Sequence, residues 1–445
     1  MIRMTLSEVA KVCDGRRLDA NAPFQGLSID SRSLEPGNLF VALKGTRSDG
    51  HDFLEAAGQR GAAGALISRQ VDSPVSRVLV DDAQKGLGQI ARTWRNRMSA
   101  RVVGITGSNG KTTVKEMLTA IVSGQSAVLA TRGNFNNEIG LPLTLARLNE
   151  THRHAIIEMG AARQGDIAYL CSIARPEVGL VNNAGPAHLE GFGDLEGVAR
   201  GKGELFECLP ENGVAVINRD DRFFDLWAGM ADKRDKITFG LDSRADVRGT
   251  TENGGLEIHT PVGVIEPEIR VPGRHNRLNA LAATACALAL DCSLEEITRG
   301  LESIASLPGR LEQHLAPGGW TVIDDTYNAN PASLYAGLSV LGDQPGERWL
   351  VLGDMAELGR NAGKLHAEMG QAAREMGVSR LLALGVQAKS SVDNFGTGAM
   401  HFADRADLED WLIGNIHPEV RCLVKGSRSM GMERIVEVLL KEQAA

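Results

Sequence analysis

The sequence predicts an α/β protein with three domains. The chain has 445 residues, and at roughly 150 residues per domain three domains are expected. Short apolar strand candidates alternate with helical segments, a pattern typical of parallel sheets covered by helices on both faces. A glycine-rich loop stands between one of these strands and a helix, as it does in nucleotide-binding sheets.

Composition narrows the class of partner. Hydrophobic residues make up 43% of the chain and charged residues 23%, which excludes a disordered or collagen-like protein. With 48 Lys and Arg against 56 Asp and Glu, the net charge is −8. Nucleic acids and anionic membranes both attract positive surfaces, so we expect neither as a partner. Aromatic residues are scarce at 4%, which disfavours base-stacking platforms.

The cysteines and the apolar runs indicate a cytoplasmic protein. None of the six cysteines forms a Cys-x-x-Cys pair, so we expect buried thiols in a reducing compartment and no zinc site. Met1–Gly15 has no apolar signal core, and the longest apolar run, Ala280–Leu290, is too short to span a bilayer. The cysteines are Cys13, Cys171, Cys208, Cys286, Cys292 and Cys422.

The first domain is expected over residues 1–98. It holds a strand candidate at Asn38–Leu43 and a helix near Asp52–Gly61. It closes with a helix whose apolar residues recur at spacings of three and four. Those residues are Leu87, Ile90, Ala91, Trp94 and Met98.

The second and third domains are expected over residues 99–312 and 313–445. In each, apolar strand candidates alternate with helices, which predicts two doubly wound sheets. The second domain ends in an Ala-rich helix from about Asn276 and a helix with a capping box of Ser293 and Glu296. The strand candidates are Arg101–Thr106, Ala155–Glu158, Val178–Val181, Val214–Ile217, Trp320–Ile323, Trp349–Leu352, Leu381–Leu384 and Val420–Val424, and a last helix is expected over Met432–Leu440.

The strongest motif is the loop Gly107–Thr113, which follows a strand candidate and opens a helix. Glycines let backbone N–H groups approach phosphate oxygens, and the helix N-terminus adds positive partial charge. Lys111 would supply a point charge for the β- and γ-phosphates, and the Thr112 hydroxyl would hold Mg²⁺. The nucleotide-binding residues expected in the loop are Gly107, Asn109, Gly110, Lys111, Thr112 and Thr113.

This loop departs from the common phosphate-binding pattern. Ile105 stands where that pattern has its first glycine, and Gly104 is one residue too early, so the loop is a shortened variant. The alternative is a glycine-rich turn with a surface lysine, which the order strand, loop, helix disfavours. The motif alone predicts binding of a nucleoside triphosphate with Mg²⁺ and leaves the reaction open.

Thr106–Thr113 resembles the ATP loop of the Mur ligase family, which also lacks the first glycine. Other segments resemble the family in the same order, so the resemblance spans the whole chain. Asn134–Pro142 and Asn182–Glu190 resemble signatures of the branch that adds D-alanyl-D-alanine. The remaining segments are Gly201–Phe206, His275–Asn279, Gly309–Glu312 and Asp324–Pro331.

The resemblance implies an architecture and a reaction. The N-terminal domain would hold the UDP of the substrate, the central domain ATP, and a C-terminal Rossmann-like domain would close over the site. ATP would phosphorylate the terminal carboxylate of UDP-N-acetylmuramoyl-tripeptide, and the amine of D-Ala-D-Ala would attack the acyl phosphate. The product would be the pentapeptide precursor of peptidoglycan, which implies a role in cell-wall synthesis, cell shape and cell division. Phosphorylation gives a poor electrophile a good leaving group, so the protein mainly positions groups and neutralises charge.

The resemblance also implies two Mg²⁺ ions, held by Thr112 and three further residues. Glu158 ends an apolar strand, at the sheet edge where ligands bind, although a strand-end acid can merely cap a turn. His188 is similar to the family's histidine ligand, whereas a lone loop histidine is more often a surface residue. Lys202 matches a lysine that CO₂ carbamylates into an anion; otherwise it is a solvated lysine. Together with Lys111 and Arg310, His188 and Lys202 are the catalytic candidates.

Further residues are candidates for nucleotide binding. Asn276 and Asn279 share a helix face and could meet the adenine edge, although Asn276 could also N-cap its helix. Arg310 could meet the γ-phosphate on domain closure or form an interdomain salt bridge. Asp325 resembles the family's ribose-binding acid, with Asp324 as the alternative because adjacent strand residues point opposite ways.

Two regions are candidates for binding the UDP-sugar-peptide. Asp30–Ser33, Lys44–Gly45 and Asp49–Phe53 resemble the family's UDP site, although short polar clusters are usually turns. Asn134 and Asn137 would touch the sugar-peptide, or form turns, which Asn favours. Lys425 could reach the phosphate or the acyl phosphate. The substrate-binding candidates are Ser31, Arg32, Lys44, Asp49, His51, Asn134, Asn137 and Lys425.

Alternatives remain within and outside the family. Folylpolyglutamate synthase shares the ATP loop but lacks a UDP domain. The ligase of the family that adds the third amino acid has that domain. However, Asn134–Pro142 and Tyr327–Pro331 resemble the ligase that adds D-Ala-D-Ala more closely. A P-loop switch would not need a second metal ion. The sequence leaves open diaminopimelate or lysine in the tripeptide, and without a heptad segment we expect a monomer.

Overall fold

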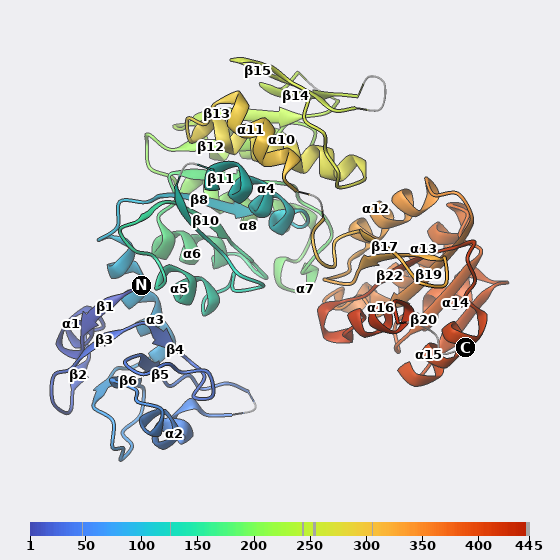
Figure 1. Ribbon diagram of the computed structural model, residues 1–445. Helices are drawn as coiled ribbons and strands as arrows, with labels where there is room; N and C mark the ends of the chain where they lie inside the picture. Colours follow the sequence, from blue (N-terminus) through green and yellow to red (C-terminus); the bar gives the residue numbers. More distant parts are fainter. Residues whose placement is uncertain (47, 125, 243, 252–254, 305, 442–445) are drawn as a thin grey trace.

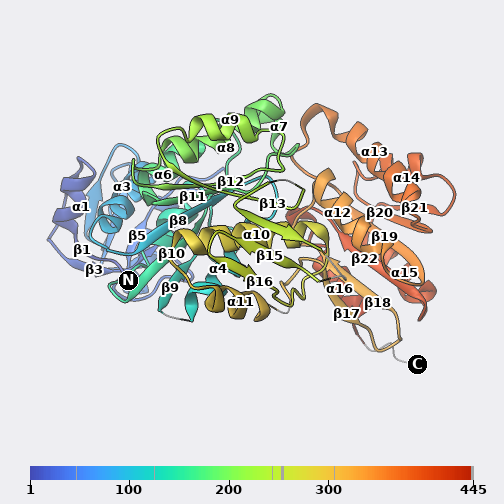
Figure 2. The ribbon, with the colours of Figure 1, turned by 90° about the horizontal axis from the view of Figure 1, so that it is seen from above.

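The computed structural model describes residues 1–46, 48–124, 126–242, 244–251, 255–304 and 306–441. Within these residues, three successive parts of the chain each build a sheet (Figure 1). The N-terminal part is blue and lies at the lower left, the central part lies at the top, and the C-terminal part is orange to red. Seen from above, the central part lies between the other two (Figure 2). The predicted α/β fold class is confirmed.

The N-terminal part forms a short antiparallel ribbon, β1–β3, and a sheet of order β2–β7–β6–β5–β4. The expected helix near residue 52 begins as a 3-10 turn, η1 (Gly50–Phe53), and continues as α2 (Leu54–Gln59). The expected apolar stripe lies on α3 (Ala83–Arg95), which ends before Met98. The other elements are β1 (Arg3–Thr5), α1 (Leu6–Val12), β2 (Arg16–Arg17), β3 (Pro23–Gln25), β4 (Leu27–Ser28), β5 (Leu39–Val41), β6 (Gly64–Ile67) and β7 (Arg77–Leu79).

The central sheet has the order β16–β15–β14–β13–β12–β11–β8–β10–β9. Its strands pair in parallel from β9 to β14, as predicted, but β14, β15 and β16 pair antiparallel, and this extension was not predicted. The elements are β8 (Arg101–Thr106), α4 (Lys111–Ser123), β9 (Ala127–Ala130), α5 (Gly140–Leu145), β10 (His152–Glu158), α6 (Asp166–Ala174), β11 (Val178–Val181), α7 (Leu189–Phe192), α8 (Leu195–Glu207), β12 (Val214–Asn218), α9 (Phe224–Met230), β13 (Asp235–Gly240), β14 (Val247–Thr250), β15 (Glu257–Thr260), β16 (Gly263–Ile265), α10 (Arg274–Ala289) and α11 (Leu294–Glu302).

Helices cover both faces of the central sheet. Helices α4, α10 and α11 bury one face, and α5, α6, α8 and α9 bury the other. The apolar core under α5, α6, α8 and α9 continues without a break through α3 into the N-terminal part. Trp94 of α3 also donates its indole N–H to the Leu148 carbonyl at 2.9 Å. The N-terminal and central parts therefore share one apolar core.

The C-terminal sheet has the order β17–β18–β22–β19–β20–β21, in which only β17 among the described strands runs antiparallel to its neighbour. Its apolar clusters draw all their buried residues from position 311 onward, so this part has its own core. The elements are β17 (Glu312–Leu315), β18 (Thr321–Asp325), α12 (Pro331–Gly342), β19 (Glu347–Gly353), η2 (Gly359–Asn361), α13 (Ala362–Glu375), β20 (Arg380–Leu384), α14 (Lys389–Phe395), β21 (Ala399–Phe402), α15 (Arg405–Asn415), β22 (Val420–Lys425), η3 (Arg428–Met430) and α16 (Glu433–Leu439).

Some local predictions are confirmed, one open alternative is excluded and one prediction is wrong. The Ser293–Glu296 capping box is present at the start of α11. Asn276 does not cap its helix, because α10 begins at Arg274 after Gly273 with φ 99°. Cys208 is exposed rather than buried, because it follows α8 at the surface; the other five cysteines are buried. None of the helices in the described ranges is long and apolar enough to cross a membrane.

Candidate active site

A cavity of about 1590 Å³ has lining residues from all three parts of the chain. The central part contributes the phosphate loop and the ends of β10 and β11, and the C-terminal part contributes the end of β18 and the start of α12. The carboxyl ends of parallel strands are where α/β sheets bind ligands. The cavity is therefore the candidate active site.

The phosphate loop lies between β8 and α4, as predicted. Gly107 and Gly110 have φ values of 154° and 80°, which glycine adopts without strain. A Cβ atom on Gly110 would collide with the side chains of Asn182 and Asn279. The loop backbone therefore requires glycine at this position. The N–H groups of Ser108 and Asn109 are bonded to Asn183, so a phosphate would meet the N–H groups at the start of α4.

The ammonium of Lys111 folds back over the loop. Its Nζ donates to the Gly107 carbonyl at 2.6 Å and lies 3.5 Å from the Ser108 carbonyl. Burial lowers the pKa of Lys111, Glu158 opposes that shift and Arg310 reinforces it. The hydrogen-bond partners of Lys111 Nζ among the described residues are neutral carbonyls, so a phosphate at the loop would give this cation a directly bonded anion.

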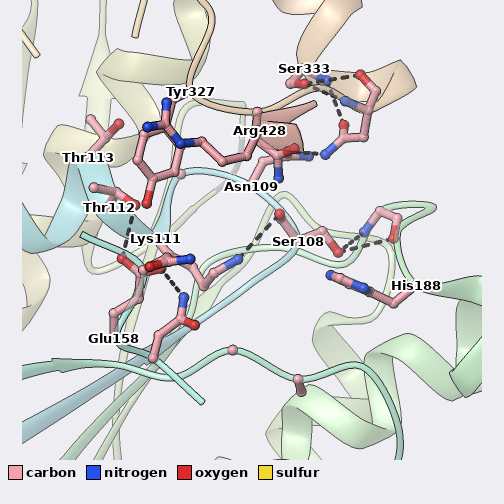
Figure 3. Close-up of a pocket in the computed structure, with 18 of the residues that line it drawn as sticks. Ser108, Asn109, Lys111, Thr112, Thr113, Glu158, His188, Tyr327, Ser333 and Arg428 are labelled. Carbon is pink, nitrogen blue, oxygen red and sulfur yellow. Dashed lines mark hydrogen bonds between the residues drawn. The ribbon is translucent and has the colours of Figure 1, made fainter. Parts of the chain in front are cut away.

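Thr112 and Glu158 present oxygens to the same point (Figure 3). The Thr112 hydroxyl donates to Glu158 Oε2 at 2.9 Å, and Asn136 Nδ2 donates to Glu158 Oε1 at 2.7 Å. Glu158 is buried at the end of β10. Mg²⁺ prefers such hard oxygen ligands, so the donor set fits that ion.

His188 precedes α7 in the chain, and Lys202 lies on the helix that follows α7. Lys202 is buried on α8, its Nζ lies 5.8 Å from the Phe192 ring centroid, and it is not a lining residue of the cavity. Burial, reinforced by Lys111, lowers the pKa of Lys202 well below its usual value. His188 lines the cavity and its Nδ1 lies 2.9 Å from Glu357 of the C-terminal part.

Asn276 and Asn279 share one face of α10, as predicted, and both line the cavity. Asn279 Nδ2 donates to Asn276 Oδ1 at 3.1 Å, and Asn182 Nδ2 donates to Asn279 Oδ1 at 2.9 Å. Asn276 Nδ2 donates to the Pro272 carbonyl at 2.7 Å. The amide chain fixes both side chains beside the phosphate loop.

Arg310 reaches the phosphate loop from the linker that precedes β17. Its Nη2 donates to the Thr112 hydroxyl at 3.0 Å, and its guanidinium lies 4.1 Å from the Tyr327 ring centroid. This hydrogen-bond partner is a hydroxyl and not the carboxylate that an interdomain salt bridge would need. Its Nε is buried without a hydrogen-bond partner among the described residues. Such an unused donor suits a phosphate oxygen.

Asp325 and Lys425 end neighbouring strands, β18 and β22, and form a buried ion pair of 2.5 Å. Lys425 Nζ also donates to the Asn328 carbonyl at 2.9 Å. Burial raises the pKa of Asp325 and lowers that of Lys425, while each partner opposes the shift of the other. Asp324 also lines the cavity, but its Oδ1 accepts from Thr326.

The substrate-binding candidates divide into two groups. Asn134 and Asn137 line the cavity, and Asn137 Oδ1 accepts from the Gly140 N–H at 2.9 Å, so it also forms a turn. The candidates of the N-terminal part do not line the cavity. Among them, Arg32 pairs with Asp30 at 2.8 Å. The group outside the cavity is Ser31, Arg32, Lys44, Asp49 and His51.

His51 is held on both sides of its ring. The side chain is buried; its Nε2 accepts from the Ser68 N–H at 2.9 Å, and its Nδ1 lies 2.6 Å from Asp49 Oδ1. The backbone N–H of His51, together with its ring, lowers the pKa of Asp49 to about 2.

Several residues of the site have roles that the sequence did not indicate. Asn136, Tyr327 and Asn330 lie in segments that resemble the family, but nothing in the sequence assigns them a partner. Glu357 lies in no motif and has φ 61°, an unusual conformation for a glutamate. Only the fold brings these residues to the loop, to Glu158 and to His188.

Known proteins resemble the chain over its full length. Family models match residues 23–95 (Mur ligase family, catalytic domain), 105–287 (Mur ligase middle domain) and 309–428 (Mur ligase, glutamate ligase domain). The UDP-N-acetylmuramoyl-tripeptide--D-alanyl-D-alanine ligases of Escherichia coli and Bacillus subtilis are 41% and 33% identical to it, and each alignment covers 99% of both chains.

Solved structures agree with this comparison. A crystal structure of MurF from Acinetobacter baumannii matches with a TM-score of 0.92 and 34% identity, covering 99% of both chains. MurF ligase from Thermotoga maritima in complex with ADP matches with a TM-score of 0.82 and 28% identity, covering 94% of this chain and 97% of that one.

The fold, the phosphate loop and these matches together define an ATP-dependent ligase built from three α/β domains. More narrowly, the chain belongs to the Mur ligase family.

Proposed function

We propose that this protein joins D-alanyl-D-alanine to a UDP-N-acetylmuramoyl-tripeptide with ATP, giving the pentapeptide precursor of peptidoglycan. One observation carries the chemistry: Arg310 and Asn330 of the linker and C-terminal part contact the phosphate loop of the central part in one cavity. The choice of substrates is supported by relatives of this name that align over 99% of the chain.

The nucleotide roles follow from the contacts around the loop. Loop N–H groups, Lys111 and Arg310 surround the place of the β- and γ-phosphates, and Thr113 lies in the first turn of α4 beside them. We assign the adenine to Asn276 and Asn279, whose amides line the cavity. We assign the ribose to Asp325, with Lys425 reaching the transferred phosphate once Asp325 meets the ribose.

Two Mg²⁺ ions fit the donors near the loop. Thr112 and Glu158 would hold one, and His188, released from Glu357, would contribute to the other. When bound, the ions neutralise the negative charge of the phosphates and of the phosphate in transfer.

Lys202 suits the proposed carbamate because burial favours its neutral amine over the ammonium. The neutral amine is the form that adds to CO₂, and the resulting carbamate would be an anion beside the cation Lys111. This modification turns a costly buried cation into a charge that Lys111 stabilises.

The reaction is a two-step acyl transfer. A carboxylate oxygen of the tripeptide attacks the γ-phosphorus, and ADP leaves. The amine of D-Ala-D-Ala then attacks the carbonyl carbon of the acyl phosphate, and inorganic phosphate leaves as the amine loses a proton. Lys111 and Arg310 stabilise the charge on the phosphate in both steps. A closed cavity keeps water from the acyl phosphate.

We assign residues 1–98 to binding of the UDP-sugar-peptide, residues 99–312 to binding of ATP and residues 313–445 to domain closure. Ser31, Arg32, Lys44, Asp49 and His51 would hold the UDP, and Asn134 and Asn137 the sugar-peptide at the cavity. The separate core of the C-terminal part supports such closure, since a polar interface lets domains move. We propose a cytoplasmic monomer.

The test is phosphate release with ATP, Mg²⁺ and UDP-N-acetylmuramoyl-tripeptide, with and without D-Ala-D-Ala, while product mass is recorded. We expect release only with both acceptors, and a pentapeptide product. Release that depends on a single amino acid instead would assign the protein to another reaction of the family. Release without any acceptor would contradict a ligase. Tripeptides ending in diaminopimelate and in lysine, compared in parallel, identify the preferred third residue.

A further inference from the structure

A side-chain amide of the C-terminal part donates a hydrogen bond to the phosphate loop. Asn330 Nδ2 donates to Asn109 Oδ1 at 2.7 Å, although the two residues are 221 positions apart. Asn109 lies in the loop between Ser108 and Gly110, and Asn330 immediately precedes α12. The contact is partly buried within the cavity that both residues line. It is thus a direct link between the nucleotide site and the C-terminal part.

Asn330 uses its two amide atoms for different purposes. Its Oδ1 accepts from the Ser333 N–H at 2.9 Å and so caps α12, and Ser333 Oγ accepts from the Asn330 N–H at 3.1 Å. This cap aims the remaining Nδ2 at the loop. Serine is as good a cap as asparagine but is one atom shorter. A serine in this position would keep the helix and lose the contact with Asn109.

Asn109 is held from two sides. The central part holds its backbone: Asn183 Oδ1 accepts from the Asn109 N–H at 2.9 Å, and the Asn182 and Asn183 amides donate to its carbonyl at 3.0 and 3.1 Å. Asn330 holds its side chain. The loop is bounded by Gly107 and Gly110, which add little stiffness of their own. Hence the Asn330 contact restricts the loop in a way that the central part does not.

We propose that Asn330 is a positioning residue that couples nucleotide binding to docking of the C-terminal part. By holding Asn109, it keeps the loop N–H groups in the arrangement that a bound phosphate requires, so the loop loses less entropy on binding. Coupling is reciprocal, so a nucleotide in the loop favours the docked arrangement to the same degree. The inference rests on the proposed function for the identity of the nucleotide.

The test measures ADP binding with Mg²⁺ by calorimetry on the full chain, without tripeptide or D-Ala-D-Ala. We expect Asn330→Ser to weaken ADP binding about three- to tenfold, the effect of one lost hydrogen bond. Its thermal midpoint without ligand should stay within about 2 °C of wild type, because the cap survives. In turnover, KM for ATP should rise by a similar factor while kcat changes less than about twofold, since the contact is the same in ground and transition states.

A double-mutant cycle separates coupling from a general loss of structure. Asn109→Ala removes the acceptor, so the double variant should bind ADP as weakly as Asn109→Ala alone. Asn394→Ser, on α14, is the matched control and should bind ADP like wild type. Effects that multiply in the double variant, or wild-type affinity in Asn330→Ser, would overturn the inference and leave the proposed function standing. A wild-type chain that binds no ADP would overturn both.

Discussion

The Thr112 hydroxyl donates a hydrogen bond to Glu158 at 2.9 Å, and this bond joins the first turn of α4 to the end of β10. The two residues are 46 positions apart in the chain. The parallel sheet brings them together because Thr112 follows β8, Glu158 ends β10, and these two strands lie side by side. Asn136 binds the second Glu158 oxygen. The carboxylate is therefore fixed beside the phosphate loop before any ligand arrives.

This geometry predicts that Glu158→Gln lowers kcat by about 100-fold or more, because the ion that neutralises the phosphates loses an anionic ligand. ADP binding should also become nearly independent of Mg²⁺ concentration, as calorimetry at several Mg²⁺ concentrations would reveal. Glu211→Gln, an exposed glutamate, serves as control. Full turnover with unchanged Mg²⁺ dependence in Glu158→Gln would remove Glu158 from the metal site.

Lys111→Ala should abolish ATP-dependent turnover, by about 100- to 1000-fold, because the cation nearest the transferred phosphate is gone. The fold should survive, since the variant loses a partly buried charge whose partners are the Gly107 and Ser108 carbonyls. Steady-state phosphate release and circular dichroism check the two expectations. Lys233→Ala, at an exposed position, is the comparison. Near-normal turnover in Lys111→Ala would reject the phosphate-loop assignment.

Much of the fold could be predicted from periodicity and from the loop. The buried strands β8, β10, β11 and β12 each contain a short apolar run, so each was predicted to within a few residues; the prediction for β10 began at Ala155 and omitted its polar start, His152–His154. The antiparallel extension β14–β16 was missed because its strands are half-exposed and short. The exposed Cys208 was missed for a similar reason: cysteine is usually buried, and only the end of α8 decides otherwise.

The site was predicted less completely, because the sequence indicates residue types and not their partners. Asp325 and Lys425 were both candidates, yet nothing in the chain says that they form one ion pair. Tyr327, Asn330 and Glu357 act across the interface between the central and C-terminal parts. Such contacts depend on how two sheets are placed relative to each other, and no local sequence pattern predicts that placement.

Lys202→Ala should lower activity strongly, because the proposed carbamate would be lost with the amine. A short carboxylic acid such as acetate or propionate, added at millimolar concentration or above, should restore part of the activity by placing an anion in the vacated space. Phosphate release measured against acid concentration tests both effects. Full activity in Lys202→Ala without added acid would end the carbamate proposal, and rescue by a neutral amide of the same size would argue against a charge effect.

The Tyr327 ring should position Arg310 through stacking rather than through its hydroxyl. The guanidinium lies 4.1 Å from the ring centroid and at the same time meets Thr112. Cation–π contacts of this kind contribute about 0.5–2 kcal/mol. Tyr327→Ala should therefore lower kcat/KM for ATP by about 3- to 30-fold, whereas Tyr327→Phe, which keeps the ring, should lose little. Equal losses in the two variants would assign the effect to the hydroxyl.

The N-terminal part should lose stability in acid through Asp49. His51 lowers the pKa of Asp49 to about 2, below its usual 3.8. A carboxyl with a depressed native pKa stabilises the fold fully above its unfolded pKa and progressively loses that effect as the pH falls toward the native value. The window for this residue is therefore about pH 4 to 2. Above it, the Asp49 anion stabilises the turn that holds His51.

Asp49→Asn isolates this contribution, because asparagine caps η1 as well as aspartate does but does not ionise. We expect the variant to be less stable than wild type at pH 7, and the gap to narrow as the pH falls from 4 to 2. Urea unfolding at steps of pH, followed through the transition that unfolds the shared core of the N-terminal and central parts, measures the gap. Asp410→Asn, an exposed acid of α15, is the control. If wild type and Asp49→Asn lose stability in parallel over that range, the His51 contact does not stabilise the Asp49 anion.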